Sequence, residues 1–424
     1  MLELNRIRAE KEEIVKALEK RHVKEAGQLI EEIIKLDDLR KSTQTRNDEI
    51  LAETNQLSKQ IGGLMKEGKR DEAEAIKQRS AELKSESKDL SDKLSVTENE
   101  IKQLLYKIPN TPNKSVPEGK SADDNEVVYQ HGDIPQLHDG ALPHWDLIKQ
   151  YDIIDFELGN KVSGAGFPFY KGKGARLQRA MINFFLDEAQ KMGFDEVQPP
   201  IVINEDSGYG TGQLPDKDGQ MYHIQLENFF LIPTAEVPIT NMYRDVIVDA
   251  KQLPIKHVGY TPCFRREAGS WGAHVRGLNR LHQFDKVEIV QIQHPDKSYE
   301  SLNEMCEYVQ GLLEKLELPY RVLNLCAGDL GFTSAQTFDM EVFSAAQQKW
   351  LEVSSVSNFE TFQANRLKLR FRGEDKKTQL LHTLNGSALA LPRILASILE
   401  NNQTPDGIRI PKVLVPYTGF DMIN

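Results

Sequence analysis

Proline is absent from the first 108 residues of this 424-residue chain and then occurs at Pro109, Pro112 and Pro117 in quick succession. A proline inside a helix removes a backbone hydrogen bond and clashes with the preceding turn, so a proline-free segment rich in Glu, Lys, Leu and Gln can be helical throughout. The proline cluster then has to stop it. We therefore predict an N-terminal helical domain at residues 1–107, a linker at 108–130 and a second domain at 131–424.

Two runs of the helical segment carry a residue from the predicted seam at every seventh position: Leu36, Thr43, Ile50, Leu57 and Leu64, then Ile76, Leu83, Leu90, Thr97 and Leu104. Gly62, Gly63 and the polar residues 66–70 lie between the runs and are typical of a turn. This pattern predicts an antiparallel two-helix coiled coil over about residues 28–104, with helices of roughly 45–50 Å. A short helix at about 3–19 precedes it. A spacing or dimerisation arm with a solvated, charged surface is the alternative interpretation.

Charge and composition exclude several classes of protein. The net charge is −11 but is unevenly distributed. Residues 1–107 hold 22 basic and 23 acidic residues and are nearly neutral, whereas the remaining chain holds 31 basic and 41 acidic residues. A polyanion would therefore be repelled least by residues 1–107. No stretch approaches the ~20 apolar residues that span a bilayer. Cys263, Cys306 and Cys326 are an odd, widely spaced set, which argues against a disulfide scaffold. No secretory signal begins the chain, so we expect a cytoplasmic protein.

After residue 130, several β-rich runs follow one another without a helix long enough for a crossover. The sequence therefore predicts an α+β domain with a mainly antiparallel sheet: strands at 196–202, 229–232, 256–260, 286–293, 320–325, 337–343, 350–356 and 379–385, and helices at about 172–192, 236–245, 297–317 and 388–401. The sequence contains neither the Gly-x-Gly-x-x-Gly fingerprint of dinucleotide-binding folds nor the Gly-x-x-x-x-Gly-Lys-Ser/Thr sequence of the P-loop. A nucleotide would therefore have to be held in another way.

Two segments of this domain carry residues that are uncommon in strands: a pair of prolines in one, and a neighbouring arginine and glutamate in the other. A helix ending near Gly193 leads into a strand with Pro199 and Pro200, which places that strand at an edge or an interface because proline cannot donate a ladder hydrogen bond. Farther on, Arg265 and Glu267 stand two apart and share one strand face before an arginine-bearing loop. They form either a structural ion pair or a phosphate-binding pair.

A third segment runs from a strand into Asn385-Gly386-Ser387, which we expect to cap a helix that carries Arg393 about two turns in. An arginine on an otherwise apolar helix face needs a counter-charge, because a buried unpaired cation is costly. A triphosphate would supply that charge.

Taken in order, these segments (about 175–202, 261–288 and 381–400) resemble motifs 1, 2 and 3 of the class II aminoacyl-tRNA synthetases. Phe264-Arg265-x-Glu267 is similar to the motif 2 signature and Ala-Leu-Ala-Leu-Pro-Arg393 to the end of motif 3. The strings Thr234-Ala235-Glu236, His282-Gln-Phe-Asp-Lys-Val-Glu288, Glu352-Val-Ser-Ser355 and Leu-Asn-Gly-Ser387, with the helical arm, narrow the resemblance to the seryl-tRNA synthetase family. The resemblance extends over essentially the whole chain.

The resemblance implies an ATP-dependent ligase that forms seryl-adenylate and then charges tRNA(Ser), and tRNA(Sec) where that tRNA exists. It implies serine contacts at Thr234, Ala235, Glu236, Glu288, Thr383, Asn385 and Ser387. The ATP contacts it implies are Arg265, Arg266, Glu267, Leu281, His282, Gln283, Phe284, Glu352, Val353, Ser354, Ser355 and Arg393.

By the same resemblance, Arg265 meets the α-phosphate, Glu267 reads the adenine amino group and Phe284 stacks on adenine. Glu352 and Ser355 would hold Mg²⁺, whose preference for oxygen ligands they match. Pro200 would lie in a homodimer interface. The arm would bind tRNA by backbone shape through Lys66, Lys69, Arg70, Lys77, Arg79 or Lys84.

Two other functions remain open at this stage. An amino acid:carrier-protein ligase would share the ATP-binding strings and would be expected to lack the long hairpin. A non-catalytic paralogue with a helical arm and a dead nucleotide site is the second alternative, and the joint presence of Arg265, Glu267, Glu352 and Arg393 argues against it.

Overall fold

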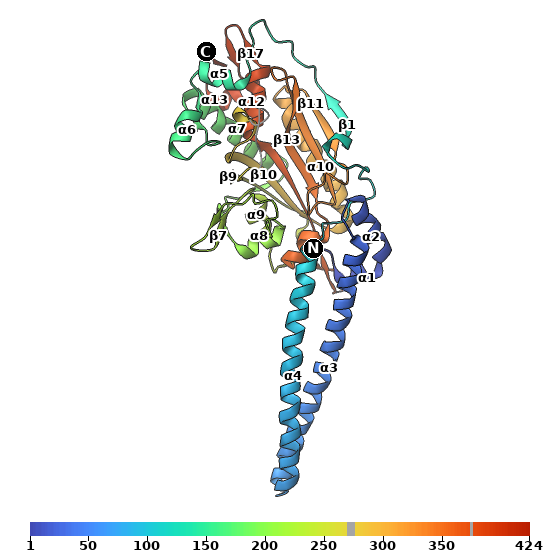
Figure 1. Cartoon of the computed structure of the whole chain (residues 1–424). Helices are drawn as coiled ribbons and strands as arrows, with labels where there is room; N and C mark the ends of the chain where they lie inside the picture. Colours follow the sequence, from blue (N-terminus) through green and yellow to red (C-terminus); the bar gives the residue numbers. More distant parts are fainter. Residues whose placement is uncertain (269–275, 374–375) are drawn as a thin grey trace. The chain divides into compact units, whose positions relative to one another are not determined.

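A computed structural model describes residues 1–268, 276–373 and 376–424. By contact density the chain divides into two compact units, residues 2–109 and residues 110–424, with Met1 belonging to the second unit. Figure 1 colours the chain from blue at the N-terminus to red at the C-terminus. Among the residues described, no helix is long and apolar enough to cross a membrane.

The first unit is entirely helical, with α1 (Leu4–Ala9), α2 (Lys11–Lys20), α3 (Ala26–Lys66) and α4 (Arg70–Leu105). The long pair α3 and α4, drawn in blue and cyan in Figure 1, confirms the predicted two-helix arm. Ion pairs from Arg46 to Glu86 and from Arg79 to Glu53 show that the helices run antiparallel, since the residue number rises along one helix as it falls along the other.

The turn lies within the predicted residues 66–70, but it does not include the two glycines named with them, and the start of this unit differs from the prediction. Gly62 and Gly63 lie inside α3, and the chain reverses at residues 67–69, where Gly68 adopts a left-handed φ of +77°. Glycine adopts this conformation without a steric cost, so the third glycine makes the turn. The helix expected at 3–19 is two helices, interrupted at Glu10.

Polar side chains occupy much of the seam between the two arm helices. Thr43, Asn47 and Ser80 are buried there, and Asn47 Oδ1 accepts a 2.7 Å hydrogen bond from Ser87 Oγ across the pair. Because polar side chains take the place of apolar ones at these positions, the apolar seam between the helices is thin, and the bond between Asn47 and Ser87 helps to fix their register.

The second unit is built on an eight-stranded sheet in the spatial order β1, β11, β12, β13, β16, β10, β9, β4. All neighbours pair antiparallel except β4 and β9, so the mainly antiparallel α+β fold is confirmed. The strands are β1 (Glu126–His131), β4 (Asp195–Glu196), β9 (Ile255–Phe264), β10 (Gln283–Gln293), β11 (Tyr320–Asn324), β12 (Gln336–Ser344), β13 (Lys349–Asn358) and β16 (His382–Ala390).

The hydrophobic core lies between this sheet and three helices, α7 (Gly172–Lys191), α10 (Ser298–Lys315) and α12 (Leu391–Asn401). In α7 the residues Leu177, Met181 and Phe185 recur at every fourth position and are fully buried, which explains why this helix lies against the sheet. With one face of the sheet covered in this way, the opposite face of its central strands is left to form a site.

Short elements complete the unit. The helices are α5 (His144–Gln150), α6 (Phe156–Val162), α8 (Glu205–Thr211), α9 (Glu236–Asn241), α11 (Thr361–Leu367) and α13 (Val415–Thr418). The strands are β2 (Ile154–Asp155), β3 (Phe169–Tyr170), β5 (Val202–Asn204), β6 (His223–Ile224), β7 (Phe229–Leu231), β8 (Ile247–Asp249), β14 (Arg370–Arg372), β15 (Thr378–Leu380), β17 (Gln403–Thr404), β18 (Gly407–Arg409) and β19 (Met422–Ile423).

Three sequence predictions about local structure were wrong. Arg265 and Glu267 do not share a strand face, because β9 ends at Phe264 and Glu267 has a left-handed backbone. Asn385-Gly386-Ser387 is no helix cap, because β16 continues to Ala390 with partners in β10 and β13, and the helix starts only at Leu391, with Pro392 in its first turn. Arg393 therefore lies in the first turn of α12 and not two turns in. The strand expected at 196–202 is divided into β4 and β5, since Pro199 and Pro200 interrupt it.

Candidate active site

A cavity of about 580 Å³ opens on the face of the sheet that the core helices leave uncovered. It draws side chains from β10, β13 and β16 and from the first turn of α12. Fourteen of the residues predicted from the sequence line it: Thr234, Glu236, Arg265, Glu267, Leu281, Phe284, Glu288, Glu352, Val353, Ser354, Ser355, Asn385, Ser387 and Arg393.

Among the residues that line the cavity, Lys286 and Glu288 form a buried ion pair with 2.7 Å between Nζ and Oε2. Lys286 Nζ also donates to Thr234 Oγ1 at 2.9 Å, and Asn385 Nδ2 donates to Glu288 Oε1 at 2.9 Å. Ser387 Oγ lies 3.4 Å from Glu288 Oε2. Because each charge is paired and hydrogen-bonded, a buried polar pocket of this kind is tolerated, and it suits a small zwitterion with a hydroxyl group.

Glu236 stands beside this pair, at the first position of α9, and is 5% exposed. Burial raises the pKa of its carboxyl to about 7; the nearby Glu288 carboxylate acts in the same direction and the hydrogen bond from Gln363 against it. Gln363 Nε2 donates to Glu236 Oε1 at 2.6 Å, and Thr383 Oγ1 donates to Gln363 Oε1 at 2.7 Å. Because burial disfavours the charged form of Glu236, a cationic group bound beside it in the cavity would stabilise its carboxylate.

The motif 2 side chains Arg265 and Glu267 also line the cavity. The Arg265 guanidinium carbon lies 5.2 Å from the centroid of the Phe284 ring, and Arg265 Nε donates to the carbonyl of Pro233 at 3.3 Å. Glu267 forms a 2.7 Å ion pair with Arg280 and has a left-handed φ of +49°, which is strained for a non-glycine residue. Both predicted partners therefore point into one space lined by an aromatic ring.

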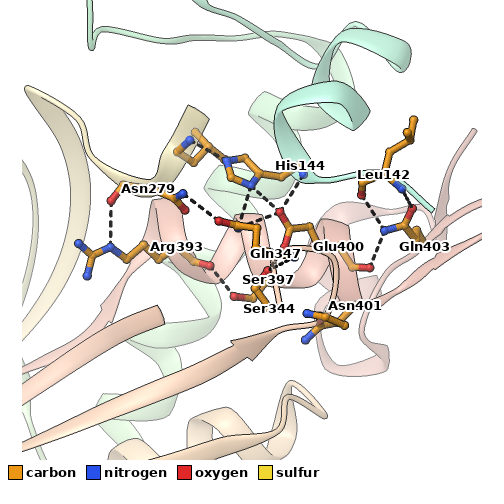
Figure 2. Close-up of polar contacts among 12 residues, drawn as sticks. Leu142, His144, Asn279, Ser344, Gln347, Arg393, Ser397, Glu400, Asn401 and Gln403 are labelled. Carbon is orange, nitrogen blue, oxygen red and sulfur yellow. Dashed lines mark hydrogen bonds and ion pairs between the residues drawn. The ribbon is translucent and has the colours of Figure 1, made fainter. Parts of the chain in front are cut away.

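Arg393 enters the cavity from the first turn of α12. Its Nε donates to the carbonyl of Asn279 at 3.0 Å, and its Nη1 donates to the carbonyl of Glu352 at 2.7 Å and lies 3.6 Å from the Glu352 carboxylate. Figure 2 shows the bond to Asn279. Backbone carbonyls thus orient the guanidinium without neutralising it, which leaves its charge available to a phosphate group.

Glu352 and Ser355 share one face of the sheet although they are three residues apart. A bulge in β13 pairs Glu341 with Glu352 and Met340 with Ser354, so one extra residue shifts the alternation between them. Burial raises the pKa of the neighbouring Asp339 well above its ordinary range, and the charge of Glu352 adds to this. The bulge therefore brings the carboxylate of Glu352 and the hydroxyl of Ser355 to the same face, where both oxygens could bind one cation.

These two oxygens fit Mg²⁺ as a partial ligand set, because Mg²⁺ keeps several waters and takes phosphate oxygens beside one or two protein ligands. Within the described ranges, no group of three or more His, Cys, Asp or Glu side chains is arranged to hold a metal by itself.

Six predicted residues lie outside the cavity lining. Ala235 and Thr383 are buried behind it, and the side chain of Arg266 is exposed. His282 packs against Phe167 and accepts or donates a 2.7 Å bond with Tyr222. Two exposed residues complete the set: Gln283 and Pro200.

Sequence analysis missed Lys286, Asn279 and Gln363. Lys286 carried a usable signal, since Phe284, Lys286 and Glu288 alternate along β10 and all three line the cavity. Nothing local marked Gln363, because it reaches Glu236 from a short helix 127 residues away.

The antiparallel sheet and the arginine-bearing cavity define the catalytic domain of a class II aminoacyl-tRNA synthetase. Residues 222–402 match the family described as the tRNA synthetase class II core domain (G, H, P, S and T), and residues 1–112 match the seryl-tRNA synthetase N-terminal domain. The chain belongs to the seryl-tRNA synthetase family.

Similar proteins cover the chain from end to end. Serine–tRNA ligases of Salinibacter ruber and Prosthecochloris aestuarii are 49% and 44% identical, each over 100% of this chain and 99% of its own length. The crystal structure of seryl-tRNA synthetase from Pyrococcus horikoshii complexed with ATP superposes with a TM-score of 0.92 at 34% identity, covering 100% of this chain and 99% of that one. A cytoplasmic serine–tRNA ligase from Naegleria fowleri in complex with AMP gives 0.87 at 28% identity over the same shares.

Proposed function

We propose that this chain is an ATP-dependent serine–tRNA ligase that joins L-serine to the 3′ end of tRNA(Ser), and of tRNA(Sec) where that tRNA exists. The observation that carries the proposal is the single cavity that is lined by Thr234, Glu236 and Glu288 and also by Arg265 and Arg393. A small polar pocket next to two guanidinium groups suits an amino acid held beside a polyphosphate.

In the first step, a serine carboxylate oxygen attacks the α-phosphorus of ATP, the bond from that phosphorus to the bridging oxygen breaks, and pyrophosphate leaves with the electron pair. Such a displacement needs alignment and charge neutralisation more than a protein nucleophile. We assign the α-phosphate to Arg265, the far phosphates to Arg393, and the adenine to Phe284 and Glu267. Arg280 pairs with Oε2 of Glu267, and the second carboxylate oxygen can accept from the adenine amino group.

For serine, we assign the ammonium group to Thr234 and Glu236, and the hydroxyl to the cluster of Glu288, Asn385 and Ser387. Lys286 holds Glu288 in place as it does now. A pocket whose polar groups pair with a substrate hydroxyl rejects alanine strongly, because those groups would otherwise stay unpaired, whereas threonine is excluded only by size.

We assign Mg²⁺ to Glu352 and Ser355, which present a carboxylate and a hydroxyl on one sheet face. When bound, the ion would neutralise phosphate charge and orient the leaving pyrophosphate. Glu352 also lies 3.6 Å from Arg393, so the same carboxylate positions both cations near the phosphates.

In the second step the terminal ribose hydroxyl of the tRNA attacks the seryl carbonyl, and AMP leaves. We assign tRNA recognition to the helical domain at residues 1–107, whose arm exposes Lys66, Arg70 and Lys84. An exposed, antiparallel helix pair suits a long RNA backbone better than individual base edges. This arm also favours tRNA over a carrier protein as the acceptor.

We further propose a cytoplasmic homodimer joined through motif 1. Pro200 is exposed there, as are the apolar side chains of Met192 and Ile201, beside β4 at the edge of the sheet. Light scattering tests this directly: a mass of about twice 48.2 kDa supports the dimer, and a monomer at working concentration contradicts it.

Amino-acid-dependent exchange of pyrophosphate into ATP tests the activity. We expect exchange with serine, at least about 100-fold less with alanine, and charging of tRNA(Ser) by the same preparation. Absence of serine-dependent exchange would contradict the proposal and leave a non-catalytic protein. Exchange without tRNA charging would favour the carrier-protein ligase.

Glu236→Gln is expected to abolish serine activation and to stabilise the ligand-free protein at high pH. A carboxyl whose pKa is raised from 4.5 to about 7 by folding lowers the free energy of unfolding as pH rises through that interval. The decrease in the free energy of unfolding is small below pH 4.5 and complete above pH 7, where it reaches about 3 kcal/mol. Glutamine carries no such penalty, so urea unfolding is expected to favour the variant at pH 8 and hardly at pH 4.5. A difference that does not change with pH would contradict the assignment.

A further inference from the structure

Behind the cavity, between α5, α12 and the turn that joins β12 to β13, lies a cluster of buried polar groups (Figure 2). At its centre are the side chains of His144 and Glu400, each 0% exposed. The Glu400 carboxylate accepts hydrogen bonds from the backbone and Nδ1 of His144 at 2.8 and 2.6 Å, from Gln347 Nε2 at 2.9 Å and from the hydroxyl of Ser344. Neither His144 nor Glu400 lines the cavity.

The hydrogen bonds of His144 determine which ring nitrogen carries the proton. Its Nε2 lies 2.8 Å from the backbone nitrogen of Leu278, whose N–H can only donate. Nε2 is therefore an acceptor, and the proton lies on Nδ1, where it is donated to Glu400. The imidazole is held at both nitrogens, so it links the last turn of α12 to the returning limb of motif 2, residues 276–279.

That returning limb is shaped to fit the histidine. Gly277 has a left-handed φ of +65°, and a Cβ at this position would lie 2.3 Å from His144 Nε2, so any other residue would displace the ring. Next to it, the Arg276 guanidinium stacks 4.8 Å from the centroid of the Trp145 ring. The limb is thus packed on two consecutive residues of α5.

From this limb the contacts continue to Arg393. Asn279 Nδ2 donates to Gln347 Oε1 at 2.9 Å, and the same amide of Gln347 donates to Glu400. The carbonyl of Asn279 accepts the 3.0 Å bond from Arg393 Nε. Arg393 and Glu400 are seven residues apart on α12, which is two turns, so both lie on the same side of that helix. Asn279 is consequently held from its side chain while its carbonyl orients the arginine.

We propose that His144 and Glu400 are positioning residues for Arg393 and act on it through Gln347 and Asn279. The proposal rests on the proposed function in one respect, namely that Arg393 binds the phosphates of ATP. Burying the polar pair of Glu400 and His144 costs desolvation that a hydrophobic pair of similar size would avoid, which is reasonable where the network orients a guanidinium within a few tenths of an ångström.

Gln347→Leu tests the proposal. Gln347 is half-buried and leucine is close to it in volume. The change removes the link between Glu400 and Asn279, and Gln347, unlike its partner Asn279, does not line the cavity. We expect the dissociation constant for ATP to rise about tenfold, the apparent KM for serine to stay within twofold, and the unfolding midpoint to stay within a few degrees. The matched control is Gln348→Leu, in the same turn, where the side-chain amide donates only to the nearby carbonyl of Ala345 among the described contacts.

A double-mutant cycle with Arg393→Ala separates a positioning role from a structural one. If Gln347 acts through Arg393, Gln347→Leu is expected to weaken ATP binding no further once Arg393 is alanine. Unchanged ATP affinity in Gln347→Leu, additive losses in the double variant, or equal losses for serine and ATP would overturn the proposal. If Arg393→Ala alone leaves ATP affinity unchanged, the phosphate assignment of Arg393 fails, and the present inference fails with it.

Discussion

Arg393→Ala is expected to abolish formation of seryl-adenylate while the protein stays folded. The guanidinium is held by two backbone carbonyls, those of Asn279 and Glu352, and its charge is only partly balanced by the Glu352 carboxylate at 3.6 Å. A cation fixed in this way stabilises the negative charge that develops on the phosphates in the transition state, and removing such an arginine lowers the rate roughly 10³–10⁵-fold. Serine-dependent pyrophosphate exchange measures the loss.

Arg393→Lys is the matched control for the geometry of this group. Lysine keeps the charge but cannot donate to both carbonyls in the fork geometry of a guanidinium, so we expect partial activity, well below the wild type. Circular dichroism and the unfolding midpoint are expected to change little in either variant, because the carbonyls released are near the cavity and reachable by water. Exchange kinetics in Arg393→Ala equal to those of the wild type would refute the phosphate role.

Shortening the arm is expected to spare adenylation and to abolish tRNA charging. Residues 51–83 can be replaced by a short glycine-containing turn, which keeps the Arg46–Glu86 pair and the bond between Asn47 and Ser87 that hold the proximal register. Because the arm belongs to a compact unit separate from the one that contains the cavity, pyrophosphate exchange is expected to stay within twofold. We expect kcat/KM for tRNA(Ser) charging to fall at least about 100-fold.

A second variant keeps the full length of the arm and reverses the charge of three exposed basic residues, with Lys66→Glu, Arg70→Glu and Lys84→Glu combined. If the arm binds the RNA backbone, this variant is expected to lose charging and the wild type is expected to lose affinity as salt concentration rises. Charging that survives the shortening would show that the arm is only a spacer.

Regular patterns made most of the fold predictable. The two runs of heptad spacing, 36–64 and 76–104, identified the helix pair, and the succession of short β-rich runs identified a mainly antiparallel sheet. Misplaced boundaries had local physical causes. Asn385-Gly386-Ser387 reads as a cap, yet strand pairing on both sides of β16 overrides that preference, and Gly62-Gly63 stays helical because Gly68 makes the turn.

The candidate site was predictable where residues act from regular strands and not where they act through contacts distant in sequence. Arg265 and Glu267 were identified as a pair, but the shared strand face predicted from their spacing was wrong, because β9 ends before them and Glu267 has a left-handed backbone. The bulge in β13 that brings Glu352 and Ser355 to one face follows from pairing with β12, which periodicity along a single strand does not reveal. The bond between Gln363 and Glu236, like the pair of His144 and Glu400, depends on tertiary packing alone.

A crystal structure with ATP, Mg²⁺ and a non-reactive serine analogue tests the central claim most directly. We expect one triphosphate in the 580 Å³ cavity, with Arg265 on the α-phosphate, Arg393 on the far phosphates, and the ion on Glu352 and Ser355. A nucleotide bound elsewhere, or Arg265 and Arg393 directed at separate places with no phosphate between them, would contradict the account.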